Sequence, residues 1–189
     1  MNGRDSDNPI LPSTTRLLGV SVHPRSFGFV IIENGSVLDT GVRSCWTPEF
    51  EDCLGSRLRR IMQAYKPSAL ILRTGQSNSP SPQKNLLAHV INRIAKQQNI
   101  TTFRISQHTL QRYFLDYHAI TKHEIASTVA RLLPELAWQL PRKRKPWESQ
   151  QYRMAIFDAA AGVIACTPVS QKESPGNSAN LPDCGTAEV

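Results

Sequence analysis

RLLGVSV at residues 16–22 is a short apolar run typical of a buried β-strand. Residues 27–32 form a second apolar run, and the four residues 33–36 separate it from a third run at residues 37–43. The turn has Asn34-Gly35 at its centre, which favours a type I′ hairpin because both residues tolerate positive φ. The sequence therefore predicts that three antiparallel strands open the domain.

Helix and strand patterns alternate after this hairpin. Residues 54–65 carry apolar side chains at helical spacing, and residues 69–72 are a continuous apolar run typical of a central strand. A loop rich in Gly, Ser and Pro at residues 74–82 leads to a second amphipathic helix over residues 86–94. Residues 100–105 alternate like a further strand and lead into a short helix near residues 108–114. This order predicts an α/β domain with a five-stranded mixed sheet flanked by helices.

The C-terminal half adds helices and one basic loop. Thr121-Lys122-His123-Glu124 has the spacing of a capping box and predicts a helix start. A basic loop at residues 141–147 precedes a final Ala-rich helix over residues 150–166. Trp46 and Trp138 are expected to pack in the core.

The two ends differ in composition from the body. Residues 1–15 lack periodicity, and residues 168–189 are rich in Ser, Pro, Gly and Asn. We expect a disordered leader, one domain at residues 16–167 and a disordered tail. The sequence contains neither an apolar run near the roughly 20 residues of a membrane helix nor a signal-peptide core in its first 13 residues. We therefore expect a cytoplasmic protein with no membrane partner.

The four cysteines are widely spaced and form no C-x-x-C pair. We expect reduced cysteines, because neither a zinc site nor a disulfide framework fits this spacing. They are Cys45, Cys53, Cys166 and Cys184.

Basic residues are concentrated in the body of the chain. Residues 16–167 hold 20 of the 22 Lys and Arg but only 10 of the 15 acidic residues, a balance of +10. Such a balance favours a polyanionic partner, usually nucleic acid.

Three stretches of the chain stand out together. The first is Leu18-Gly19-Val20-Ser21, with Gly28 nine residues after Gly19. The second is KPSALILR at residues 66–73, and the third is FDAAAGVIA at residues 157–165. In this order they resemble the RuvC Holliday-junction resolvases of the RNase H-like superfamily, whose last helix is similar to the third stretch. The resemblance implies an RNase H-like fold.

The family's chemistry uses four acids around two divalent metal ions, which share the attacking and leaving oxygens. Carried over by position, the resemblance places these acids at Ser21, Arg73, Asp158 and Ala161, where only Asp158 is acidic. Arg73 would place a permanent cation among the metal ligands. We therefore expect no cofactor, with Mg²⁺ or Mn²⁺ bound at Asp158 only if nuclease activity is retained. An ion pair between Arg73 and Asp158 is expected to replace the metal.

The most distinctive surface feature is the run Arg142-Lys143-Arg144-Lys145-Pro146-Trp147. Four cations followed by an aromatic residue suit phosphate contacts and stacking on a base. The alternative is a solvated charge run with Trp147 packed under the last helix. Helical cations that could extend a positive surface are Arg57, Arg59, Arg60, Lys84 and Arg93.

Three functions fit these observations. The leading hypothesis is a catalytically degenerate RuvC-like domain that binds nucleic acid, DNA more than RNA, branched or single-stranded. The second is an active metal-dependent endonuclease with relocated ligands, among which His23, Glu33, Asp39 and Glu148 are the nearest candidates. Of these, Asp39 is expected to face solvent, and Glu148 to cap the last helix or to interact favourably with its dipole. The third is a protein interaction scaffold, for example a homodimer.

Overall fold

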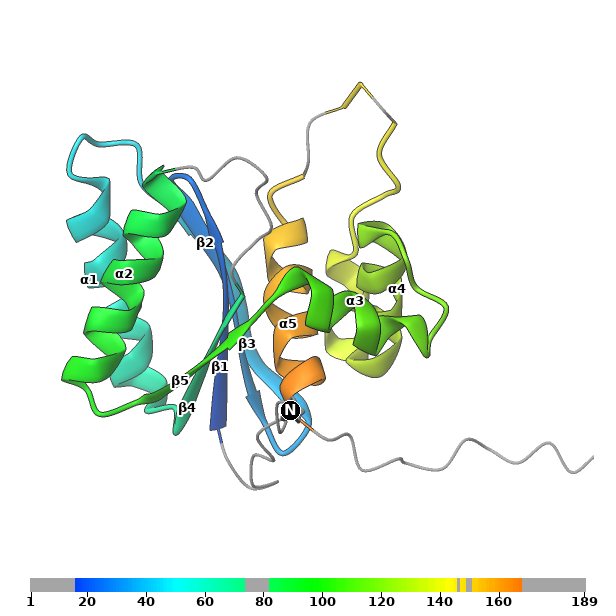
Figure 1. Cartoon of the computed structure of the whole chain (residues 1–189), viewed down its shortest axis with the longest axis horizontal. Coiled ribbons are helices and arrows are strands. Elements are labelled where there is room, and N and C mark those ends of the chain that lie inside the picture. Colours follow the sequence, from blue (N-terminus) through cyan, green and yellow to red (C-terminus); the bar gives the residue numbers. More distant parts are fainter. Residues whose placement is uncertain (1–15, 74–81, 146, 149–150, 168–189) are drawn as a thin grey trace, which may run out of the picture.

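The structure is a computed structural model that describes residues 16–73, 82–145, 147–148 and 151–167 (Figure 1). The predicted leader, the predicted tail and residues 74–81 of the predicted loop lie outside the described residues. The strands are β1 (Arg16–His23), β2 (Ser26–Glu33), β3 (Ser36–Ser44), β4 (Ala69–Arg73) and β5 (Thr101–Ile105). The helices are α1 (Phe50–Tyr65), α2 (Pro82–Gln97), α3 (Gln107–Leu115), α4 (Lys122–Leu132) and α5 (Met154–Cys166), with a short 3₁₀ helix, η1 (Pro134–Gln139).

The five strands form one mixed sheet in the order β3-β2-β1-β4-β5. β1 pairs antiparallel with β2 and parallel with β4, and β5 extends the parallel part. The β2–β3 turn has φ of 52° at Asn34 and 78° at Gly35, as a type I′ hairpin requires. The predicted five-stranded mixed sheet, with its antiparallel opening, is confirmed.

Helices cover both faces of the sheet (Figure 1). α1 and α2 lie on one face, and α5 lies on the other with α3 and α4 outside it. β1, β2 and β4 divide their side chains between two cores, because successive residues point to opposite faces. Leu17 and Ile71 belong to the core beneath α5, whereas Leu18 belongs to the core beneath α1 and α2.

Two glycines allow α5 to approach the sheet closely. A Cβ atom at Gly19 would lie 2.7 Å from the carbonyl oxygen of Ala159, and one at Gly28 would overlap the backbone of Ala155. Every residue of α5 from Met154 to Cys166 is buried. The helix is therefore held against β1 and β2, and this packing fixes the position of Asp158.

Several expectations about local structure are wrong. Trp46 and Trp138 are 77% and 75% exposed and do not pack in the core. The last helix begins at Met154 instead of residue 150, and η1 follows α4 where the apolar spacing predicted nothing. None of the described helices is long and apolar enough to cross a membrane.

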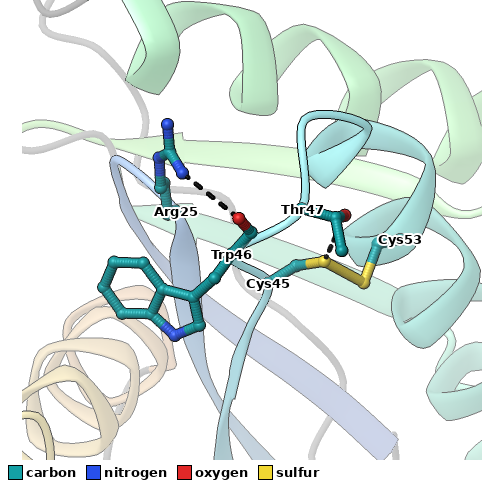
Figure 2. Close-up of a disulfide and its surroundings, with 5 residues drawn as sticks. All are labelled: Arg25, Cys45, Trp46, Thr47 and Cys53. Carbon is teal, nitrogen blue, oxygen red and sulfur yellow. Dashed lines mark hydrogen bonds between the residues drawn. A yellow bond between two sulfur atoms is a disulfide. The ribbon is translucent and has the colours of Figure 1, made fainter.

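The cysteines are also not all reduced. Cys45 at the end of β3 and Cys53 on α1 form a disulfide, with Cα atoms 6.4 Å apart (Figure 2). The chain reversal from β3 into α1 brings them within disulfide range, which spacing alone did not indicate. Cys166 is a free, buried thiol whose pKa is raised to about 11 by burial. Cys184 lies outside the described residues.

Candidate functional site

The candidate site lies where β1, β4 and β5 end. Ser21 is the register partner of Arg73, and Arg73 is the partner of Ile105, so the three carboxyl ends meet at one edge of the sheet. α3 begins at Gln107, two residues after β5 ends. The sheet order thus places polar residues from separate segments side by side, as is common at the carboxyl ends of parallel strands.

Arg73 and Asp158 form the centre of this site. Nη1 of Arg73 contacts Oδ1 of Asp158. Both side chains are buried, with 4% of the Arg73 side chain and 9% of the Asp158 side chain exposed. The other terminal nitrogen of Arg73 donates a hydrogen bond of 2.7 Å to Oε1 of Gln107. The predicted ion pair between Arg73 and Asp158 is confirmed.

A second cation lies beside this pair. Nζ of Lys122, the first residue of α4, is 3.6 Å from the other carboxylate oxygen of Asp158. The side chain of Lys122 is half-exposed, so the cluster reaches the surface there. Two cations therefore share one carboxylate, and the site carries a net positive charge.

Ser21 and Ala161 complete the set of positions taken from the family resemblance. Both are buried, and neither carries a charge. Ala161 lies one turn after Asp158 on α5, and Ser21 lies beside Arg73 across the β1–β4 pair. The four positions are thus gathered by β1, β4 and α5 at one edge of the sheet.

These side chains do not fit a two-metal centre. Mg²⁺ needs several hard oxygen ligands, and the carboxylate of Asp158 already faces two cations. Across the described residues, no group of three or more His, Cys, Asp or Glu could hold a metal ion. The described side chains at this edge therefore offer too few free oxygen ligands for two divalent ions.

The candidate relocated ligands have other contacts. Glu33 pairs with Arg16 at 2.8 Å. Asp39, which was expected to face solvent, is partly buried and accepts a 2.8 Å hydrogen bond from the Tyr65 hydroxyl. That bond, followed by burial, raises the pKa of Tyr65. His23 is the last residue of β1.

Glu148 holds the basic loop instead of capping α5. Its carboxylate accepts a hydrogen bond of 2.9 Å from Arg142 Nη2 and one of 3.1 Å from the backbone N–H of Lys145. Its backbone carbonyl oxygen accepts a hydrogen bond of 2.8 Å from Arg144 Nη1. The prediction that Glu148 caps the last helix is wrong, because α5 begins six residues later.

The basic loop presents its cations to solvent. Arg142, Lys143, Arg144 and Lys145 are all exposed, and Trp147 is 78% exposed. The alternative in which Trp147 packs under the last helix is therefore wrong. Nζ of Lys145 lies 5.5 Å from the centre of the indole ring, within cation–π range. Pro146 lies outside the described residues.

The base of this loop is attached to the start of α4. Nε2 of His123 lies 3.1 Å from the carbonyl oxygen of Pro141. Hydrogen bonds from the backbone N–H groups of Thr121 and Ile120 lower the pKa of Glu124, and the charge of Lys143 lowers it further. Since Lys122 in the same turn contacts Asp158, the loop begins beside the buried ion pair.

Two further aromatic residues lie exposed near this edge: Tyr152, which no sequence pattern singled out, and Trp46, which was expected in the core. Tyr152, just before α5, is 67% exposed, with the guanidinium of Arg153 5.9 Å from its ring. Trp46 lies two residues after Ser44, the last residue of β3. The cations of the first two helices lie elsewhere: Arg57, Arg60 and Arg93 are exposed on α1 and α2, on the opposite side of the sheet from α5. Arg59 there is partly buried, and the side chain of Lys84 lies outside the described residues.

Comparison with known proteins identifies the fold. No protein-family model matches this chain, and no curated protein matches its sequence. Among solved structures, Thermus thermophilus RuvC in complex with a Holliday junction substrate aligns over 80% of this chain and 91% of its own, with a TM-score of 0.59 and 13% identity. A second structure of Thermus thermophilus RuvC aligns with a TM-score of 0.60 and 13% identity, over 79% of this chain and 92% of its own. The yeast mitochondrial Holliday junction resolvase Ydc2 aligns with a TM-score of 0.54 and 15% identity, over 85% of this chain and 81% of its own. The predicted RuvC-like version of the RNase H-like fold is confirmed.

Proposed function

We propose that this chain, which has the RuvC-like fold, binds nucleic acid at the carboxyl edge of its sheet without cleaving it. The observation that carries the proposal is the buried Arg73–Asp158 ion pair at the place where the family resemblance puts two metal ligands. The proposed binding domain spans residues 16–167. The proposed ligand is DNA more than RNA, in branched or single-stranded form.

The proposed absence of cleavage is supported by the charges at the site. A metal ion there would have to displace Arg73 and Lys122 from a single carboxylate. Two unit charges of like sign at about 4 Å repel by about 4 kcal/mol at the effective dielectric of a protein surface. Ser21 and Ala161 offer no carboxylate to offset that repulsion. The site is therefore better suited to a fixed ion pair than to metal-assisted hydrolysis.

Binding is supported by the surface around the ion pair. The basic loop offers four exposed cations and the exposed indole of Trp147, and its base lies beside Lys122. Cations contact phosphates whatever the base sequence, and an exposed aromatic ring can stack on an unpaired base. Thermus thermophilus RuvC, which shares the fold, has been solved with a Holliday junction, and this supports DNA as the ligand class.

The experiment is a salt titration of binding with matched charge variants. The loop variant replaces Arg142, Lys143, Arg144 and Lys145 with Gln, and the control replaces Arg57, Arg60, Arg93 and Lys96 with Gln. Both variants lose four positive charges, but the control loses them on α1 and α2. Affinity is measured by fluorescence anisotropy on a four-way junction, a duplex, a DNA single strand and an RNA single strand.

The loop variant should bind more weakly and depend less on salt. Removing one cation that binds a phosphate reduces the slope of log K against log salt by about 0.9 on duplex and about 0.7 on single strands. The control should keep most of the wild-type slope. Equal losses in the two variants would show that net charge alone drives binding, and absence of wild-type binding at low salt to every substrate would refute the proposal.

A further inference from the structure

Trp46 is a large, exposed aromatic side chain on a firmly held backbone. The N–H of Cys45 donates a 3.0 Å hydrogen bond to the carbonyl oxygen of Arg25, which extends the β2–β3 pairing by one residue. The disulfide to Cys53 attaches the same point to α1. Figure 2 shows the indole of Trp46 directed away from that disulfide. The chain therefore holds this ring in place while leaving its surface open to solvent.

Arg25 supplies a cation from the neighbouring turn. Its Nη1 lies 3.5 Å from the carbonyl oxygen of Trp46, and its guanidinium lies 5.9 Å from the ring of Phe50. Figure 2 shows the two side chains leaving adjacent segments, with the guanidinium and the indole pointing in different directions. Because the two groups do not cover each other, the guanidinium could contact a phosphate while the indole contacts a neighbouring base.

The position of Trp46 connects it with the proposed binding edge. Ser44 pairs with Ser26, and Ser26 pairs with His23 at the end of β1. Arg25 and Trp46 therefore extend from the same sheet edge at which β4 ends in Arg73. The first turn of α5 packs on Gly28 of β2, so the exposed Tyr152 and Arg153 lie toward this edge as well.

We propose that Trp46 and Arg25 form a stacking site for an unpaired nucleobase and its adjacent phosphate. This inference rests on the proposed function and specifies the ligand: a strand whose bases are not already stacked in a duplex. A ring whose backbone is already ordered loses little conformational freedom when a base stacks on it. Stacking on aromatic side chains tolerates any base, because every base has a π-face.

The test compares two exposed tryptophans on two ligands. Trp46→Ala and the control Trp138→Ala remove side chains of nearly equal exposure. Each variant is titrated with a deoxythymidine oligonucleotide and with a blunt duplex of the same length. Trp46→Ala should weaken single-strand binding by about five- to a hundredfold and duplex binding much less, whereas Trp138→Ala should change neither.

A spectroscopic readout locates the contact directly. The sequence has three tryptophans, so replacing Trp138 and Trp147 with Phe leaves Trp46 as the only indole. Its fluorescence should be quenched when the oligonucleotide binds and should change little with the duplex. Wild-type binding that is insensitive to Trp46→Ala, with no quenching, would overturn this inference and leave the proposed function intact. Absence of wild-type binding to any substrate would instead defeat the proposed function itself.

Discussion

Arg73, the last residue of β4, and Asp158, in the second turn of α5, form an ion pair that is almost fully buried. Gln107 and Lys122 complete its contacts from the first residues of α3 and α4. The pair and its neighbours therefore link the end of β4 to three helices. A charge removed from water in this way is stable only while its partner is present.

Breaking the pair should destabilise the fold strongly. Asp158→Asn leaves the guanidinium of Arg73 buried without a counter-charge, and we expect a loss of about 3–5 kcal/mol in the free energy of unfolding. The double variant Arg73→Met with Asp158→Leu should be close to wild type, because it leaves no unpaired charge buried. Urea unfolding measures both.

The control for this prediction is the exposed pair between Arg142 and Glu148, where the arginine side chain is 74% exposed. Arg142→Gln should cost less than about 1 kcal/mol, as is usual for surface pairs. If Asp158→Asn were equally mild, the buried pair would not be the structural link described here.

The close packing of α5 on the sheet can be tested by adding single methyl groups. Gly28→Ala places a Cβ against the backbone of Ala155, where neither side can move easily. We expect a loss of roughly 3 kcal/mol, at the upper end of the cost of overpacking.

Gly162→Ala is the matched control. Its Cβ would lie 3.5 Å from Ile71 Cγ2, an ordinary distance, and alanine favours the helix by up to about 1 kcal/mol over glycine. The two substitutions should therefore have opposite signs in thermal or urea unfolding. A Gly28→Ala variant as stable as wild type would show that α5 does not pack this closely.

The disulfide between Cys45 and Cys53 closes a short loop, with a sequence separation of 8 residues. The loop-entropy relation gives a stabilisation of about 2–3 kcal/mol for this length. Dithiothreitol should therefore lower the urea midpoint of wild type and leave that of the Cys45→Ser/Cys53→Ser variant unchanged. A wild-type midpoint that is equal with and without reductant would show that the bond does not form in the purified protein.

The capping box at the start of α4 predicts an acid-dependent contribution to stability. Glu124 Oε2 accepts hydrogen bonds of 2.8 Å from the N–H of Thr121 and 2.9 Å from the N–H of Ile120, and these bonds lower the pKa of Glu124 from its ordinary value. The stabilisation is complete above that ordinary value and is lost as the pH falls through the lower folded pKa. The difference in Tm between wild type and Glu124→Gln should therefore shrink in this acid range.

Thr121→Ala tests the other half of the capping box. Its hydroxyl accepts 3.2 Å from the N–H of Glu124, and removal of such a cap costs about 1 kcal/mol. This loss of stability should be similar at acid and at neutral pH, because the hydroxyl does not titrate in that range. A Tm difference for Glu124→Gln that is constant from pH 3 to 7 would contradict the assigned role of the carboxylate.

Local patterns predicted most of the fold. The Asn34-Gly35 turn and the Thr121–Glu124 capping box depend on residues close together in the chain, and both are found as expected. The ion pair between Arg73 and Asp158 was predicted from family positions, because helix and strand periodicity alone cannot bring two distant segments together. The confirmed pair shows that the positional resemblance identified neighbours in space.

Features set by chain reversals could not be predicted. Trp46 was expected in the core because tryptophan is usually well buried, but the disulfide-linked turn after β3 turns it outward. Glu148 was expected to cap α5, but the helix begins at Met154 and the carboxylate binds the basic loop. In both cases the residue lies in a loop, and the course of a loop cannot be predicted from helix or strand periodicity.

Binding and cleavage of one four-way DNA junction, measured with and without Mn²⁺, decide whether this chain binds nucleic acid without cutting it. We expect a junction complex that weakens with salt and with neutralisation of Arg142 to Lys145, and uncut DNA after prolonged incubation with Mn²⁺. Mn²⁺-dependent cleavage that is abolished by Asp158→Asn in folded protein would contradict this expectation, and would show that Asp158 serves a metal site despite its contacts with Arg73 and Lys122.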